Sequence, residues 1–231
     1  MTIIDHLLVA ALLLGLPLYG RWSFQRMVAA IARGDSDARV KEYRLTIILH
    51  VVVGSLPVVV WLVPGRSLAS LGLLVPNASV SFWLSAGAAA LIVAFFVWQG
   101  RMLAQSAEAR QVARGQLGRL EQLLPHTERE LSLFGVVSLS AGVFEEILYR
   151  GFLMWYAVQL MPIWTAVIAT SAAFGVAHVY QGAGGIIKTG VVGLVLATLY
   201  VLSGSLWIPI VLHWLTDHVQ GRMLHRVMQT A

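Results

Sequence analysis

Two neighbouring carboxylates, Glu145 and Glu146, lie in an apolar run from Leu133 to Leu160 whose only other charged residue is Arg150. A carboxylate at the centre of a bilayer costs at least about 2.5 kcal/mol. Residues four apart share one face of a helix, so Glu146 can form an ion pair with Arg150, whereas Glu145 has no such partner in its own helix. A desolvated carboxylate of this kind is suited to act as a general base towards water.

Two further apolar runs also carry ionisable residues. His178 follows Phe174 by four residues, so the phenyl ring can pack against the imidazole. His213 and Asp217 have the same spacing in the last run; an imidazole there can donate to an oxyanion or bind a metal, and the carboxylate can orient it. The sequence contains neither Gly-x-Ser-x-Gly nor His-Glu-x-x-His. We therefore expect water, rather than a serine, to be the nucleophile.

The elements that position these residues are expected to be membrane-spanning helices. The chain is 58% hydrophobic and 12% charged, and it has no Cys, which excludes disulfides, thiolate nucleophiles and Cys-based metal sites. Apolar runs of spanning length lie at 3–20, 45–64, 81–99, 134–160, 163–180, 184–202 and 206–221. The sequence predicts an all-α polytopic membrane protein of about seven helices, with the catalytic core in the last four.

This pattern divides the chain into three regions: an N-terminal three-span region with cytoplasmic loops (1–133), a four-helix catalytic core (134–221) and a cytoplasmic tail (222–231). We expect a charged loop over 21–44 and an uncharged loop, apart from Arg66, over 64–80. The stretch 101–130 is amphipathic and is expected to lie along the membrane interface.

The basic residues predict the orientation of the bundle. Of the 16 Lys and Arg residues, 14 fall on one side of the predicted helices and only Arg66 falls in a loop on the other side. The positive-inside rule places the rich side in the cytoplasm, with the N-terminus outside and the C-terminus inside. We expect the inner (plasma) membrane of a bacterium, with a lipid bilayer and a peptide or protein substrate as partners and no nucleic acid; the oligomeric state does not follow from the sequence.

Taken in order, Glu145-Glu146-x-x-x-Arg150, Phe174-x-x-x-His178 and His213-x-x-x-Asp217 resemble the three motifs of the CAAX protease and bacteriocin-processing (CPBP) intramembrane proteases. This family includes the eukaryotic prenyl-protein endopeptidase. The resemblance covers about 134–221 and implies peptide-bond hydrolysis near the cytoplasmic membrane face. It implies that Glu145 activates water with His178, while His213 and Asp217 support the oxyanion. Asp217 stands where the family often has Asn, so its expected role is to orient His213.

The resemblance leaves the use of a metal open. Family members are often called metalloproteases, and activation of water by glutamate alone is the other scheme. If a divalent metal such as zinc is present, we expect Glu145, His178 and His213 to bind it. The candidate catalytic residues are then Glu145, Glu146, Arg150, His178, His213 and Asp217. Outside the motifs, His218 is expected to be a packing or interface residue. The other histidines are expected to be structural or solvated; they are His6, His50, His126 and His225.

Two other classes of function fit the same residues. Intramembrane Glu, His and Asp also form proton relays, as in a proton-coupled transporter. The chain has no internal repeat of the kind that many transporters have, which weighs against this reading. The third possibility is a non-catalytic membrane protein that binds a peptide or confers bacteriocin immunity.

Overall fold

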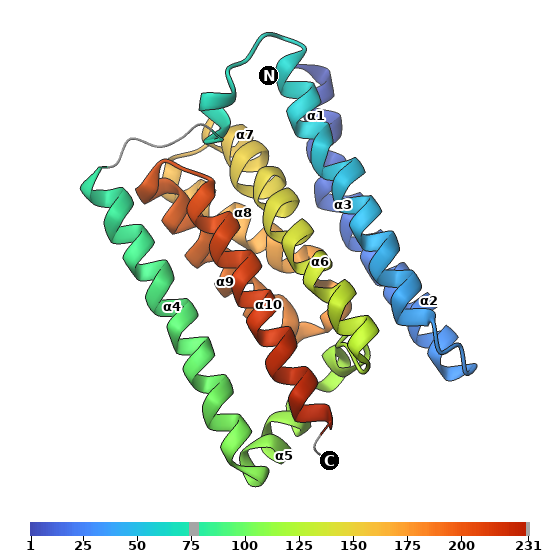
Figure 1. The fold of residues 1–231 in the computed structure, drawn as a ribbon. Coiled ribbons are helices and arrows are strands. Elements are labelled where there is room, and N and C mark those ends of the chain that lie inside the picture. Colours follow the sequence, from blue (N-terminus) through green and yellow to red (C-terminus); the bar gives the residue numbers. More distant parts are fainter. Residues whose placement is uncertain (74–78, 230–231) are drawn as a thin grey trace.

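The computed structural model describes residues 1–73 and 79–229, and these form a helical bundle without β-strands (Figure 1). Residues 74–78 of the predicted loop and residues 230–231 of the predicted tail lie outside the described part. The N-terminus lies at one end of the bundle and the C-terminal helix ends at the other (Figure 1).

The N-terminal region contributes three long helices and several short ones. The first long helix is continuous through α1 (Ile3–Ala10), a π-helical turn η1 (Ala11–Gly15) and α2 (Leu16–Ala32). The elements that follow are α3 (Ala38–Leu62), η2 (Leu68–Leu71), α4 (Val80–Gln105), α5 (Ala107–Gly115) and η3 (Gly118–Gln122).

The C-terminal region contains the four remaining long elements. A second continuous helix is formed by α6 (Glu128–Glu146), the π-helical segment η4 (Ile147–Leu153) and α7 (Met154–Val158). It is followed by α8 (Ile163–Ala177), η5 (Val179–Gln181), α9 (Ala183–Ser203) and α10 (Trp207–Gln229).

All seven predicted spans fall on helices, which confirms an all-α polytopic membrane protein. Among the described residues, five helices are long and apolar enough to cross a membrane: Ile3–Ala32, Ala38–Leu62, Val80–Leu103, Glu128–Val158 and Ala183–Ser203. The helix α8 is apolar but shorter. The helix α10 is long enough but carries His, Asp and Arg side chains, which its packing against α4, α6 and α9 partly shields.

The structure corrects two predicted loops. The charged loop expected over 21–44 is helical at both ends, because α2 continues to Ala32 and α3 begins at Ala38. The chain turns between them at Gly34, which has a positive φ of 86°. The amphipathic stretch expected over 101–130 is not one interfacial helix: α4 continues to Gln105, and Ser106 adopts an extended conformation that caps α5. At the other end of the chain, α10 continues through the expected tail to Gln229.

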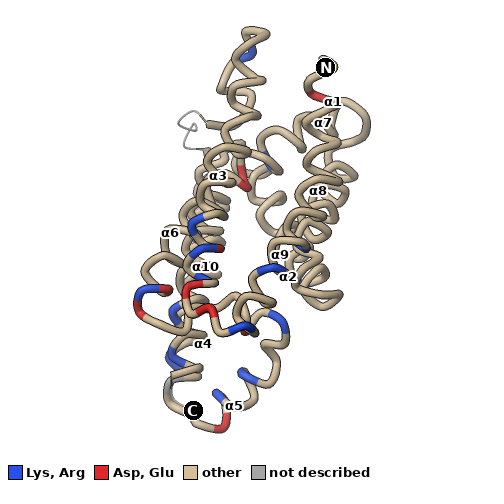
Figure 2. The backbone as a smooth tube through the Cα atoms, turned by 90° about the vertical axis from the view of Figure 1, so that its right-hand side faces the viewer, with Lys and Arg blue, Asp and Glu red and all other residues tan. Residues whose placement is uncertain are grey.

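The C-terminal region is held together by close helix contacts. The helix α6 packs against α3 and α10, and α8 packs against α9. Glycines allow these approaches: a Cβ on Gly142 would lie 2.9 Å from the carbonyl oxygen of Ile210 in α10, and one on Gly175 would lie 2.6 Å from that of Ile186 in α9. The lysines and arginines gather in the half of the bundle that holds α5 and the end of α10 (Figure 2).

Candidate active site

The two carboxylates lie where α6 changes its helical geometry. The helix begins with a capping box, in which Thr127 accepts from the backbone N–H of Glu130 and Glu130 accepts from that of Thr127. It ends at Glu146, and the π-helical segment η4 follows directly. Segments of this kind are rare and are frequently found at functional sites, because the altered turn redirects the side chains around it.

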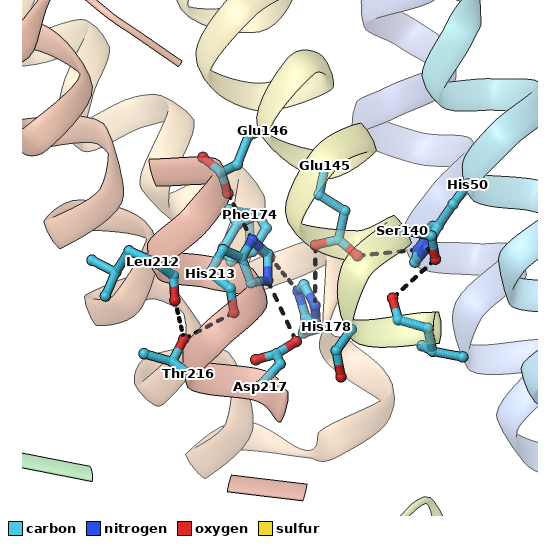
Figure 3. Close-up of polar contacts among 12 residues, drawn as sticks. His50, Ser140, Glu145, Glu146, Phe174, His178, Leu212, His213, Thr216 and Asp217 are labelled. Atoms are coloured by element: carbon cyan, nitrogen blue, oxygen red, sulfur yellow. Dashed lines mark hydrogen bonds and ion pairs between the residues drawn. The ribbon is translucent and has the colours of Figure 1, made fainter. Parts of the chain in front are cut away.

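Glu145 faces α3, where it contacts a histidine that the motifs do not include. Its Oε1 lies 3.2 Å from Nε2 of His50, and Nδ1 of His50 lies 2.9 Å from the hydroxyl of Ser140 (Figure 3). A carboxylate oxygen only accepts hydrogen bonds, so His50 donates to Glu145 from Nε2. One oxygen of Glu145 is therefore engaged and oriented by the protein.

The other oxygen of Glu145 faces His178, which is the C-cap residue of α8. Nδ1 of His178 donates to the carbonyl of Phe174 at 2.8 Å, which leaves Nε2 of the neutral ring as an acceptor. This nitrogen lies 4.0 Å from Oε2 of Glu145, and Oε2 is buried without a hydrogen-bond partner in the protein. Two acceptors thus face each other across a gap wider than a hydrogen bond.

Glu146 forms the expected ion pair and a second contact that the spacing did not predict. Its Oε1 accepts from Nη1 of Arg150 at 2.8 Å, which confirms the i, i+4 pair, and from Nδ1 of His213 at 2.8 Å. Nη2 of Arg150 donates to the carbonyl of Gly193 at 3.0 Å. Both members of the ion pair are almost completely buried, so this network connects α6 and η4 to α9 and α10.

His213 lies between two carboxylates. Its Nδ1 contacts Glu146 at 2.8 Å, whereas its Nε2 lies 3.6 Å from Oδ2 of Asp217. The side chain of Asp217 is 41% exposed and that of Glu146 is fully buried. The contact of His213 with Glu146 is therefore shorter than its contact with Asp217, although Asp217 was the residue expected to orient it.

Phe174 contacts each part of this site through its ring. Its centroid lies 4.8 Å from that of His178 and 5.9 Å from that of His213, and the guanidinium of Arg150 lies 4.4 Å above it. The predicted packing of Phe174 on His178 is confirmed. A Cβ on Gly193 would lie 3.1 Å from the ring, so a glycine at this position lets α9 approach it.

Four of the predicted residues line one cavity of about 610 Å³: Glu145, His178, His213 and Asp217. His50 and Tyr149 line it as well, and most of the remaining lining is apolar. Glu146 and Arg150 lie behind the cavity wall. The three motifs and α3 thus bring carboxylate and imidazole groups together around a space large enough for a peptide segment.

His50 is the residue that the sequence interpretation missed, since it was expected to be structural or solvated. Its signal was available: it lies inside the predicted span 45–64, where an ionisable side chain is costly. Its partner could not be identified, because Glu145 is distant in sequence and no motif connects α3 to α6.

The residues around the cavity do not fit a metal site. Over residues 1–73 and 79–229, no three His, Asp or Glu side chains are arranged to hold a metal ion, and the set expected for zinc, Glu145, His178 and His213, is no exception. His213 already contacts a carboxylate through Nδ1 and lies near another through Nε2.

Residues 127–219, about two fifths of the chain, match the family model described as Type II CAAX prenyl endopeptidase Rce1-like. The match begins at Thr127, the N-cap of α6, and ends within α10, so it spans all three motifs. No curated protein and no solved structure matches the chain. Over this region, which holds the three motifs, the chain is similar to the CAAX protease (CPBP) family of intramembrane proteases, as the motifs predicted.

Proposed function

We propose that this protein is an intramembrane endopeptidase in which Glu145 is the general base for an attacking water. The observation that carries the proposal is the pair of facing acceptors, Oε2 of Glu145 and Nε2 of His178, which lie 4.0 Å apart on the cavity wall. A water molecule has two protons to donate and can lie about 2.8 Å from both atoms. Its lone pairs then remain available for a substrate carbonyl.

The reaction follows from these positions. Glu145 accepts one proton of the water, and the water oxygen bonds to the carbonyl carbon of the scissile peptide. The tetrahedral intermediate then loses its amine as the C–N bond breaks, and Glu145 returns the proton to the leaving nitrogen. His178 orients the water through its second proton, and His50 holds Glu145 so that Oε2 faces the cavity.

The oxyanion is assigned to His213. A proton on its Nε2 can be donated to the developing negative charge, and carboxylates on both sides offset the charge of the ring. Glu146 and Arg150 do not line the cavity, so they act as positioning residues that fix His213 and Phe174. Asp217 is partly exposed on the cavity wall and supports the protonated ring from its other side.

We further propose that cleavage takes place near the cytoplasmic membrane face of a bacterial inner membrane. The support is the charge distribution, because 14 of the 16 Lys and Arg residues fall on one side of the predicted bundle. In this orientation the N-terminus is outside and the end of α10 is cytoplasmic. Cysteine labelling from either side of intact membrane vesicles, at Thr2→Cys and Gln229→Cys, measures the orientation directly.

The proposal is tested by hydrolysis in H₂¹⁸O. The purified protein in proteoliposomes is mixed with a pool of membrane-partitioning peptides of varied sequence, and the products are identified by mass spectrometry. We expect one ¹⁸O atom in each new C-terminal carboxylate. The variant Glu145→Gln should abolish labelling, whereas the exposed control Glu108→Gln should retain it. Proton-driven solute uptake without peptide cleavage would instead indicate a transporter.

The same assay separates the two schemes for activating water. Activity should persist after incubation with EDTA or 1,10-phenanthroline and removal of the chelator complex. Loss of activity that zinc alone restores would contradict activation by glutamate alone, even if Glu145→Gln is inactive.

A further inference from the structure

A second pocket, of about 210 Å³, lies between α4, α5 and α10 at the basic end of the bundle. It shares only Phe96 with the active-site cavity. Its α4 wall lies at the end of the candidate span Val80–Leu103, and Trp98, which is 57% exposed, lies beside it in sequence. Exposed tryptophans are typical of the level where the apolar core of a bilayer meets the headgroups. The pocket therefore lies at headgroup depth.

Four arginines from three elements line this small space. Arg101 comes from the end of α4 and Arg110 comes from α5. Nη1 of Arg110 donates to the carbonyl of Leu103 at 3.4 Å. Arg222 and Arg226 lie one turn apart on α10 and share a face. Among the described residues that line the pocket, none is Asp or Glu. Arg101 and Arg222 thus line a pocket whose described wall holds no carboxylate, and their positive charge favours an anion there.

The remaining lining is apolar and indicates what kind of anion fits. Phe96 and Val97 on α4 face Val219, Met223 and Val227 on α10. The two helices approach closely at this level, since a Cβ on Gly100 would lie 3.4 Å from Cγ of Met223. An inorganic anion would use only the arginines, whereas a phospholipid would use both parts of the pocket, with its phosphate among the guanidinium groups and the start of an acyl chain against the apolar wall.

We propose that this pocket binds the phosphate headgroup of an anionic phospholipid. Arginine forms paired hydrogen bonds to phosphate oxygens, which makes it the preferred side chain for this contact. Basic pockets between transmembrane helices bind anionic headgroups by the same physics. The assignment does not depend on peptide hydrolysis, because no residue of the proposed catalytic set lines this pocket.

The test is a binding measurement on the full-length protein in a zwitterionic detergent. Short-chain phosphatidylglycerol and phosphatidylcholine are titrated separately, and bound lipid is counted by native mass spectrometry. We expect tight binding of phosphatidylglycerol and weak binding of phosphatidylcholine. The double variant Arg101→Gln/Arg222→Gln should lower the affinity for phosphatidylglycerol about 30-fold, the effect of removing two basic residues near a membrane surface.

Two controls make the result specific. The pair Arg33→Gln/Arg44→Gln removes the same charge from exposed positions outside the pocket and should leave binding unchanged. The pair Arg101→Lys/Arg222→Lys keeps the charge and should recover most of the affinity, and its melting temperature verifies that the site is folded. Equal binding by the Gln pair and the wild type would overturn the proposal. Inorganic phosphate that competes at the concentration of the lipid would overturn the lipid assignment and leave a site for free phosphate.

Discussion

Two carboxylates in the apolar helices of this chain, Asp5 and Glu145, have very different surroundings. Asp5, near the start of α1, is fully buried and accepts hydrogen bonds from both terminal nitrogens of Arg66, at 2.9 and 2.7 Å. Thr2 donates a further hydrogen bond from its hydroxyl. The guanidinium lies 5.2 Å from the ring of Trp61 and 4.4 Å from that of Trp155, and Asp5 raises the pKa of Arg66 above its ordinary value. Every polar atom of this carboxylate is satisfied by the protein.

The side chain of Glu145 is 16% exposed, and only one of its two oxygens has a hydrogen-bond partner in the protein. Over the described part of the chain, three buried side-chain N or O atoms lack a hydrogen-bond partner: Oε2 of Glu145, Oε2 of Glu146 and the hydroxyl of Tyr149. All three fall on five consecutive residues at the junction of α6 and η4. Unpartnered buried polar groups are rare in folded proteins, so their concentration here needs an explanation.

The comparison teaches how to distinguish a structural charge from a reactive one. Burial alone does not separate them, because Asp5 is less exposed than Glu145. What separates them is unused hydrogen-bonding capacity on the cavity wall. Asp5 has none, whereas Glu145 lines the cavity and keeps Oε2 without a partner in the protein. Oε2 of Glu146 is also unpartnered, but Glu146 does not line the cavity. Substitutions at the Asp5–Arg66 pair should therefore affect stability, and substitutions around Glu145 should affect turnover.

The largest effect is expected for Glu145→Gln. Loss of the general base should lower kcat/KM about 10³-fold, within the range typical of general acid–base catalysis. Stability should change little, because an amide replaces a carboxylate without removing volume. Rates of ¹⁸O incorporation and thermal unfolding of the same preparation measure both quantities. A Glu145→Gln protein that melts at a lower temperature than wild type and keeps its turnover would show that Glu145 is a structural charge.

Arg66→Gln should have the opposite profile. It leaves the buried Asp5 carboxylate without its partner, and breaking such a pair costs about 3 kcal/mol, or roughly 6–12 °C in melting temperature for a chain of this size. Turnover per folded molecule should stay close to wild type. In the double variant with Asp5→Asn, the two losses should not add, since both remove the same contact. A fall in kcat at full stability would contradict a structural role.

The same two sites show what could be predicted from sequence. The pair Glu146–Arg150 was predictable because an i, i+4 spacing in a helix fixes which side chains meet. The packing of Phe174 on His178 follows for the same reason. The helices at the seven predicted spans were predictable as well, since the requirement for apolar length acts on each segment independently of the others.

Contacts between distant segments could not be predicted in this way. By local spacing, Asp5 has no basic partner in its own helix. Arg66, which pairs with it, is 61 residues away in the loop that follows α3. His50 and Glu145 meet because α3 packs on α6, which no local pattern specifies. The contact of His213 with Glu146 likewise depends on how α10 crosses α6. Local periodicity identified the ionisable groups, and tertiary packing determined which of them are satisfied.

His50 tests whether orientation of Glu145 matters for the rate. His50→Leu removes the donor to Oε1 and should lower kcat about ten-fold, the size of one hydrogen bond to a charged group. His50→Gln retains an N–H donor and should recover most of this loss. The exposed control His6→Gln lies outside the cavity and should keep the wild-type kcat. Equal rates for the Leu and Gln variants would indicate that His50 contributes packing alone.

Tyr149→Phe is the smallest and most discriminating change. Its hydroxyl is buried without a partner in the protein and its side chain lines the cavity one turn after Glu145. If this hydroxyl binds the substrate, its removal should raise KM about three- to ten-fold, the size of one neutral hydrogen bond. The free protein should become slightly more stable, because an unsatisfied polar atom is lost. Tyr156→Phe is the matched control, since the Tyr156 hydroxyl contacts His6 at 2.8 Å; it should lose stability and keep its KM. A Tyr149→Phe protein with unchanged KM and reduced stability would contradict this role. It would mean that an unpartnered atom at this junction is not by itself a sign of substrate binding. The criterion drawn from Asp5 and Glu145 would then apply to carboxylates alone.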